Sequence, residues 1–105
     1  MAYNVEIADI AFAQLNNALD YIVNDLLNPA AAEKLLEEFE SAIHIIGQSA
    51  EAFALCIEPE LARHGYRKYI LPHHKYILLY RVIEQRVFID RIYHELQDYK
   101  NLESR

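Results

Sequence analysis

The stretch "YRKYILPHHKYILLYRVIEQRVFIDRIYH", residues 66–94, decides the fold. It holds three runs dense in aromatic and β-branched residues, at 66–71, 75–82 and 86–94, separated by the short polar breaks "PHH" and "IEQ". Aromatic and β-branched side chains favour strands, and connections as short as these join antiparallel neighbours. The stretch therefore predicts three consecutive antiparallel strands.

A helical hairpin is predicted before these strands. Apolar residues recur at every third or fourth position on both sides of the pair Asn28 and Pro29, which is the spacing of a helix with one apolar stripe. Proline suits the first turn of a helix and restricts the residue before it, so one helix ends here and another begins. We expect the hairpin to start with a cap at Asp9 and to stop near Gly47. The predicted stripes are Phe12, Leu15, Leu19, Ile22 and Leu26 in the first helix, and Ala32, Leu36, Phe39, Ile43 and Ile46 in the second.

The chain begins with a further strand. Residues 3–7, "YNVEI", alternate apolar and polar side chains, as a half-buried strand does. The order strand, two helices and three strands predicts an α+β fold with the helical hairpin packed on one face of an antiparallel sheet. With 105 residues, we expect a single domain over residues 1–105.

Alternation of side chains along the strands predicts which residues share a face. On the middle strand we place Arg81 and Leu79 on the face that the helices leave uncovered. On the last strand we place Val87, Ile89, Arg91 and Tyr93 inward, and Phe88 and His94 outward. An uncovered face with basic side chains and exposed Leu79 and Phe88 would suit a protein partner.

Charge is divided unevenly along the chain. Lys34 is the one cation against eleven acids in residues 1–62, a net charge of −10, whereas residues 63–105 carry nine cations and five acids, a net charge of +4. A polyanion would be attracted to the C-terminal part and repelled by the N-terminal part. We therefore expect binding in the second half of the chain, although acidic helices can also simply carry solvated charge.

Several other classes of site are not indicated. Gly47 and Gly65 are the only glycines, which excludes a glycine-rich phosphate loop, and the neighbours His73 and His74 lack the cysteine or spaced carboxylate of a metal site. We expect no cofactor and no metal. The sequence has no apolar run near the roughly 20 residues that span a membrane and no basic start followed by an apolar segment, so we expect no membrane contact and a cytoplasmic location.

Taken together, "YRKYIL", "KYILLYRV" and "RVFIDRIYHELQDYKNL" resemble the RelE/ParE superfamily of toxins from bacterial type II toxin-antitoxin modules, also known as the plasmid stabilisation family. The resemblance covers nearly the whole chain, and its sharpest parts are "YRV" at 80–82 and "IYHELQDY" at 92–99. It implies a cognate antitoxin, which would also carry any contact with operator DNA. RelE-like members cleave mRNA on the ribosome, whereas ParE-like members inhibit DNA gyrase, so the fold leaves the target open.

RNA cleavage would need a proton acceptor, a proton donor and cations at the phosphate. The resemblance implies His94 as acid or base, with Arg81 or Arg67 at the phosphate. His94 can equally well close the strand through hydrogen bonds. Two basic residues of the RelE pattern are missing, because Ile77 follows the tyrosine at position 76 and Leu96 and Gln97 follow the last strand.

We therefore expect a toxin that binds an essential target, in the way of ParE and gyrase. The alternatives are a ribosome-dependent endoribonuclease and a degenerate toxin that retains only antitoxin binding. For Tyr99 a structural role is favoured over a binding role. The candidate residues for target or antitoxin binding are Lys68, Leu79, Phe88, Arg91, Tyr93 and Tyr99.

Overall fold

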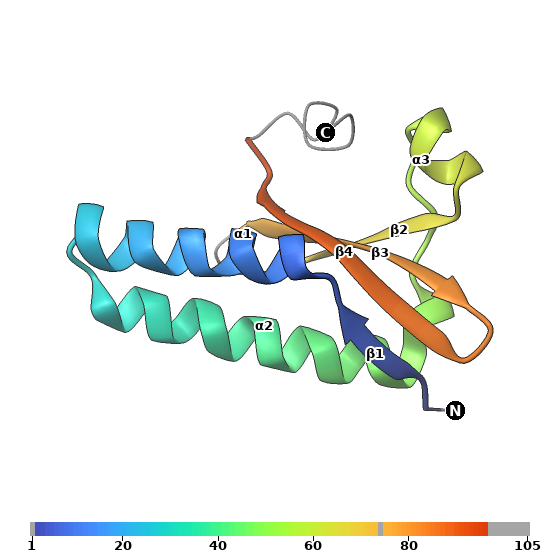
Figure 1. The fold of residues 1–105 in the computed structure, drawn as a ribbon, viewed down its shortest axis with the longest axis horizontal. Coiled ribbons are helices and arrows are strands. Elements are labelled where there is room, and N and C mark those ends of the chain that lie inside the picture. The colour runs from blue at the N-terminus through green and yellow to red at the C-terminus, as the bar shows by residue number, and fades with distance from the viewer. Residues whose placement is uncertain (1, 74, 97–105) are drawn as a thin grey trace.

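The computed structural model describes residues 2–73 and 75–96. Within these ranges the order of elements agrees with the expected α+β fold, and no helix is long and apolar enough to cross a membrane. The elements are β1 (Asn4–Ile7), α1 (Asp9–Asp20), α2 (Pro29–Ser49), α3 (Pro59–Arg63), β2 (Tyr66–Ile70), β3 (Tyr76–Ile83) and β4 (Arg86–His94), with a π-helical turn at Tyr21–Asp25 after α1 and a 3₁₀ turn at Ala50–Ala52 after α2. Figure 1 shows α1 and α2 extending to the left and the strands to the right, with α3 beside the strands.

The four strands form one mixed sheet in the order β1-β4-β3-β2. The pairs β2–β3 and β3–β4 are antiparallel, which confirms the three consecutive strands predicted from residues 66–94. The first strand pairs in parallel with β4, from Asn4 opposite Arg86 to Ile7 opposite Ile89. A parallel pair needs a long crossover, which α1 and α2 provide.

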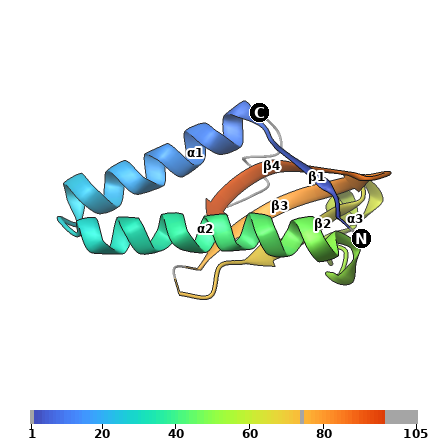
Figure 2. The ribbon, with the colours of Figure 1, turned by 90° about the horizontal axis from the view of Figure 1, so that it is seen from below.

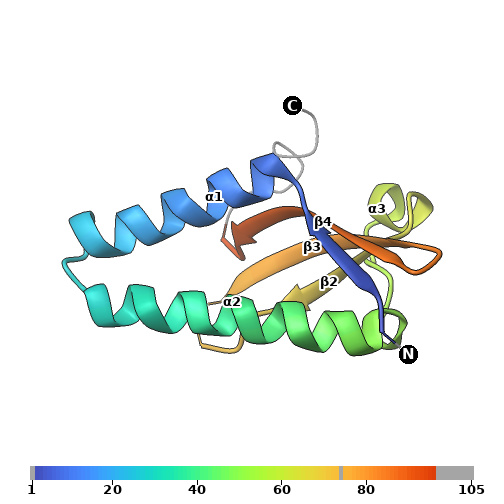
Figure 3. The ribbon, with the colours of Figure 1, turned by 60° about the horizontal axis from the view of Figure 1, so that its bottom comes forward.

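The helical hairpin covers one face of the sheet, and its two helices diverge from their connection towards the strands (Figures 2 and 3). Asn28 begins α2 as expected, because its side-chain Oδ1 accepts a hydrogen bond of 3.1 Å from the N–H of Ala31 and Pro29 follows it. Asp9 does not act as the predicted cap of α1. It lies in the first turn, where a carboxylate favours the positive end of the helix dipole.

The buried helix faces differ from the predicted stripes. Phe12, Leu26 and Leu36 are exposed, whereas alanines fill several places in the core. Small side chains let a helix approach its neighbours closely, so a helix can bury an alanine row and leave larger residues at its margin. The buried apolar residues are Ala11, Leu15 and Ala18 in α1, and Ala32, Leu35, Phe39, Ala42 and Ile46 in α2.

The helix α2 ends at Ser49, close to Gly47 as predicted, and Gly47 itself lies within the last turn. A Cβ atom added at Gly47 would lie 3.4 Å from the Cγ2 atom of Val5. The carbonyl oxygen of Gly47 also accepts a hydrogen bond of 2.8 Å from the N–H of Tyr3. The end of α2 therefore contacts the start of β1 directly at Gly47.

A β-bulge in β4 reverses the predicted faces of its last residues. Opposite β3, Leu79 pairs with Arg91 but Tyr80 pairs with Ile89, so Asp90 has no partner residue on β3. Up to Ile89 the predicted alternation is confirmed. Beyond the extra residue, alternation continues with the opposite parity. Ile92 consequently joins the core under the helices, and the inward placement of Arg91 and Tyr93 and the outward placement of His94 are wrong.

The face of the sheet opposite to α1 and α2, called the far face below, is partly covered by α3. Leu61 of α3 and Cys56 pack there against Leu79 and its neighbours. Leu79 lies on the predicted face, but its predicted exposure is wrong, because only 3% of it is exposed. The residues of this second core are Cys56, Leu61, Ile77, Leu79 and Tyr93.

Candidate functional site

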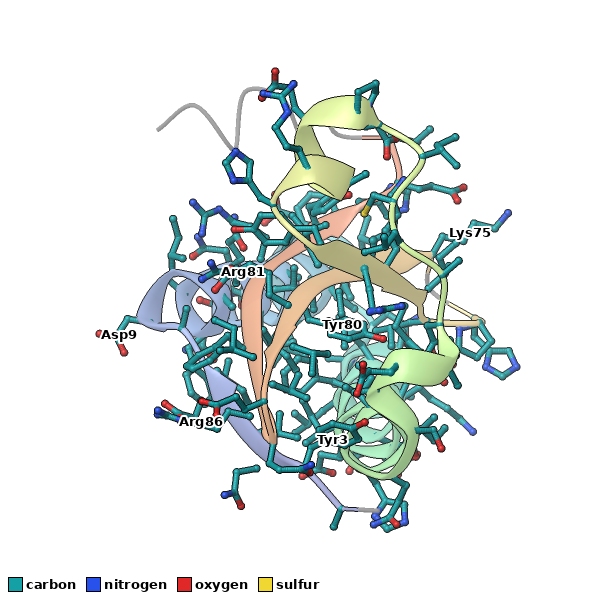
Figure 4. All side chains as sticks on the ribbon, turned by 90° about the vertical axis from the view of Figure 1, so that its right-hand side faces the viewer. Tyr3, Asp9, Lys75, Tyr80, Arg81 and Arg86 are labelled. Carbon is teal, nitrogen blue, oxygen red and sulfur yellow. The ribbon has the colours of Figure 1, made fainter. Side chains whose placement is uncertain are left out.

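Of the three residues named for catalysis, Arg81 lies on the far face of the sheet, whereas Arg67 and His94 lie on the face that the helices cover. Arg67 pairs with Tyr80 and faces the helices, where it donates a hydrogen bond to the carbonyl oxygen of Phe53. Arg81 pairs with Tyr66 and points to the far face. Figure 4 labels Tyr80 and Arg81, which leave β3 on opposite sides. The sheet therefore separates Arg81 from Arg67.

His94 lies at the end of β4, on the side of the helices. It contributes to a groove of about 550 Å³ together with Tyr76 of β3 and residues of α1. Its ring meets the Tyr76 ring edge to face, with 5.2 Å between ring centroids, and its Nδ1 accepts a hydrogen bond of 3.2 Å from the N–H of Leu96. Partial burial in this groove raises the pKa of Tyr76 above its usual 10.0. The groove is lined by Gln14, Asn17, Ala18, Tyr21, Tyr76, Ile92 and His94.

Gln14 fixes α1 against the end of β4. Since β1 pairs with β4 only as far as Ile89, the N–H of Ile92 has no strand partner on that side. It donates a hydrogen bond of 2.8 Å to the Oε1 atom of Gln14. Buried backbone donors need such partners. The hydrogen bond between Gln14 and Ile92 thus joins α1 to the end of β4 beside the groove of His94, and it satisfies a backbone donor that β1 does not reach.

The far face carries a charged cluster beside the bulge, formed by Tyr66, Arg81, Asp90 and Arg91. The Nε atom of Arg81 donates to the Oδ2 atom of Asp90 at 2.9 Å, and the Arg81 Cζ atom lies 5.3 Å from the centroid of the Tyr66 ring. Partial burial, together with the hydrogen bond that its hydroxyl donates to Asp90, raises the pKa of Tyr66 above 10.0. Asp90 is therefore held by both Arg81 and Tyr66.

Arg91 is less completely satisfied. One terminal nitrogen, Nη1, donates to the carbonyl oxygen of Asp90 at 2.8 Å. Its Nε atom is buried and has no hydrogen-bond partner within residues 2–73 and 75–96. The sequence suggested Arg81 and Arg91 separately, but it did not suggest Tyr66 or Asp90. The bulge brings these residues together, and the pattern of apolar residues does not indicate where the bulge lies.

The other candidate binding residues do not share one surface. Lys68 forms an ion pair with Glu58 at 3.1 Å, which fastens the segment before α3 to the sheet. Phe88 is half-buried on the far face, with the Cζ atom of Arg86 5.0 Å from its ring centroid. Tyr93 lies in the core under α3, and Tyr99 lies outside the described residues.

The described part of the chain contains no group of three histidine, cysteine, aspartate or glutamate residues that could hold a metal ion. His73 hydrogen-bonds through its ring and its backbone N–H to Glu38 of α2, so it connects the β2–β3 turn to the helix. His74, the other member of the pair, lies outside the described residues.

Comparison with known proteins agrees with this fold. The family described as "ParE toxin of type II toxin-antitoxin system, parDE" matches residues 5–99. Among solved structures, the chain is similar to one from the chromosomal ParDE toxin-antitoxin system of P. aeruginosa, with 22% sequence identity and a TM-score of 0.72, over 89% of this chain and 96% of that chain. No curated protein matches the sequence. Because the family match spans nearly the whole chain, this protein belongs to the ParE toxins of type II toxin-antitoxin systems.

Proposed function

We propose that the toxin arrests growth by binding an essential target, with DNA gyrase as that target, and that a cognate antitoxin neutralises it. The observation that carries this proposal is the position of Arg81, on the far face of the sheet, away from Arg67 and the groove of His94. A binding inhibitor does not need these three side chains to converge. Cleavage of RNA would need a base, an acid and a cation around one phosphate.

Ile77 also supports binding over cleavage. It stands where the RelE pattern has an arginine, and it is buried beneath α3 with Leu61 and Leu79. An arginine here would place a charge inside an apolar cluster, which is costly without a partner. The position therefore contributes to packing in this chain.

A ribosome-dependent endoribonuclease is the second candidate, because His94 lies in a groove with Tyr21 and Tyr76. Imidazole is suited to proton transfer near neutral pH, and tyrosine rings can stack on bases. A degenerate toxin with antitoxin binding alone is the third candidate. Gyrase, the ribosome and the antitoxin are all reached in the cytoplasm, where we place the protein, and operator DNA would be contacted only through the antitoxin.

The first prediction separates these candidates. The purified toxin is expected to inhibit supercoiling by gyrase and to leave mRNA intact in a translating extract. His94→Ala is expected to arrest growth as the wild type does when it is induced without antitoxin. Cleavage of mRNA by the wild type that is lost in His94→Ala would contradict the proposal and support the nuclease. Growth without arrest by the wild type would support the degenerate toxin.

The second prediction concerns the antitoxin. We expect its toxin-binding segment to be acidic and amphipathic, because the far face exposes basic side chains beside the half-buried Phe88. Attraction between exposed charges is screened by salt, so the affinity should fall steadily as the salt concentration rises. Isothermal titration calorimetry at several salt concentrations measures this. An affinity that is independent of salt would contradict the prediction.

A further inference from the structure

We propose that the guanidinium groups of Arg91 and Arg81 form an anchor for a single carboxylate side chain of the antitoxin, on the far face beside the β-bulge. This inference rests on the proposed neutralisation by an antitoxin and specifies the position and chemistry of one contact. It assigns the bulge a role, since the extra residue brings Asp90 and Arg91 to the same face as Arg81.

The cluster already contains one carboxylate and has capacity for another. Asp90 accepts from the Nε atom of Arg81 at 2.9 Å and from the hydroxyl of Tyr66, so its charge balances that of one arginine. Arg91 forms no ion pair within residues 2–73 and 75–96, and its bond to the Asp90 carbonyl involves a neutral acceptor. The four residues therefore carry a net charge of +1, and this charge resides on Arg91.

The buried Nε atom of Arg91 is the strongest indication that an acceptor is expected there. It has no hydrogen-bond partner among the described residues. A buried donor without a partner costs free energy, more so when the group is charged. A planar guanidinium can donate two parallel hydrogen bonds to one carboxylate, which would satisfy the donor and balance the charge together.

A carboxylate on a folded segment fits this surface better than a nucleic-acid strand. Asp90 lies at the centre of the cluster and would repel a strand that brings several phosphates, whereas an amphipathic segment brings one carboxylate at a time. Phe88 pairs with Arg81 on the same face and is half-buried, so it offers an apolar contact next to the charged one. An acidic amphipathic segment presents both kinds of group.

The third prediction tests the anchor with four variants and the antitoxin protein as the probe. Arg91→Gln is expected to weaken antitoxin binding by about 30-fold or more, as loss of one member of a buried charge pair does. Arg91→Lys retains the charge without the fork and should lose less affinity. Lys34→Gln, the control, removes an exposed cation from α2, on the opposite side of the sheet from the cluster, and should change the affinity by about threefold or less.

Asp90→Asn supplies a result with the opposite sign. The substitution removes the negative charge that balances Arg81 and repels an incoming carboxylate, so binding should tighten by severalfold even though the free toxin becomes less stable. If the cluster only supported the fold, Arg91→Gln and Asp90→Asn would both weaken binding in proportion to their loss of thermal stability. That outcome would overturn the proposal.

The possible failures are distinguishable. If the wild type does not bind the antitoxin at all, the proposed function fails. If the wild type binds and Arg91→Gln binds equally well, only the anchor fails. Loss of affinity for a single-stranded RNA oligonucleotide, with antitoxin binding unchanged, would assign the arginines to a phosphate and would also overturn the proposal.

Discussion

Replacing Leu35 with alanine is expected to lower the free energy of unfolding by about 2–5 kcal/mol, the usual cost of truncating a buried leucine. Leu35 is 0% exposed and lies in the core between α2 and the sheet. Its neighbour Leu36 is 39% exposed, so Leu36→Ala removes less buried surface and leaves no enclosed cavity, and it should cost only about 1 kcal/mol. Urea unfolding followed by circular dichroism measures both free energies.

The pair of variants is a matched comparison, because both remove the same atoms from adjacent positions of one helix. Alanine has the higher helix propensity, so neither substitution weakens α2 through its backbone. Equal losses for the two variants would show that α2 is rotated relative to the observed packing. A larger loss for Leu36→Ala would show that Leu36, and not Leu35, lies on the buried face of α2, as the sequence predicted.

That difference between Leu35 and Leu36 shows what apolar spacing can and cannot determine. The spacing correctly predicted two helices and their boundary at Asn28 and Pro29. It did not determine which face of each helix is buried. Several faces of α2 carry apolar residues, and the face with the largest side chains was predicted to be the buried one. The observed face includes Ala32 and Ala42, which are favoured by the distance between the layers rather than by hydrophobicity alone.

The parts of the sheet that depend on neighbouring segments of sequence could be predicted. Short breaks determined the antiparallel pairs β2–β3 and β3–β4, but nothing local in residues 3–7 identified β4 as the partner of β1. The parallel pairing depends on where the helical crossover returns the chain. The five-residue helix α3 also escaped notice, since it is too short to show a helical period.

The candidate site was predicted less well than the fold because it depends on the bulge at Asp90. Strict alternation placed Arg91 and Tyr93 with Val87 and Ile89, which is correct only for an uninterrupted strand. One extra residue transferred Arg91 to the far face and His94 to the side of the helices. The residue types were therefore found, but not which of them share a surface.

The second large effect concerns Tyr80, whose side chain is fully buried and whose hydroxyl donates a hydrogen bond of 2.7 Å to the carbonyl oxygen of Ala50. Tyr80→Phe removes the hydroxyl donor, so the carbonyl oxygen of Ala50 loses this hydrogen bond. We expect a loss of about 1–3 kcal/mol in the free energy of unfolding at neutral pH, the cost of an unsatisfied buried group. Tyr21→Phe is the control, because Tyr21 is exposed, and should cost less than about 0.5 kcal/mol.

The pH dependence of the same variant gives a sharper test. Burial raises the pKa of Tyr80 from 10.0 to about 12, because the apolar surroundings disfavour the phenolate. In the unfolded chain the phenol ionises near its ordinary pKa, so unfolding becomes easier as the pH rises above 10. The stability that Tyr80 contributes is complete below about pH 10, and a shift of this size corresponds to about 2–3 kcal/mol lost by about pH 12.

Tyr80→Phe cannot lose this contribution, so the stability advantage of the wild type should shrink as the pH rises from about 10 to 12. Burial also raises the pKa of Tyr76, but wild type and variant share that effect, and the difference between them isolates Tyr80. Urea unfolding at a series of alkaline pH values measures it. A difference that stays constant up to about pH 11.5 would show that the buried phenol ionises as readily in the folded state as in the unfolded one, and that water reaches the contact between Tyr80 and Ala50.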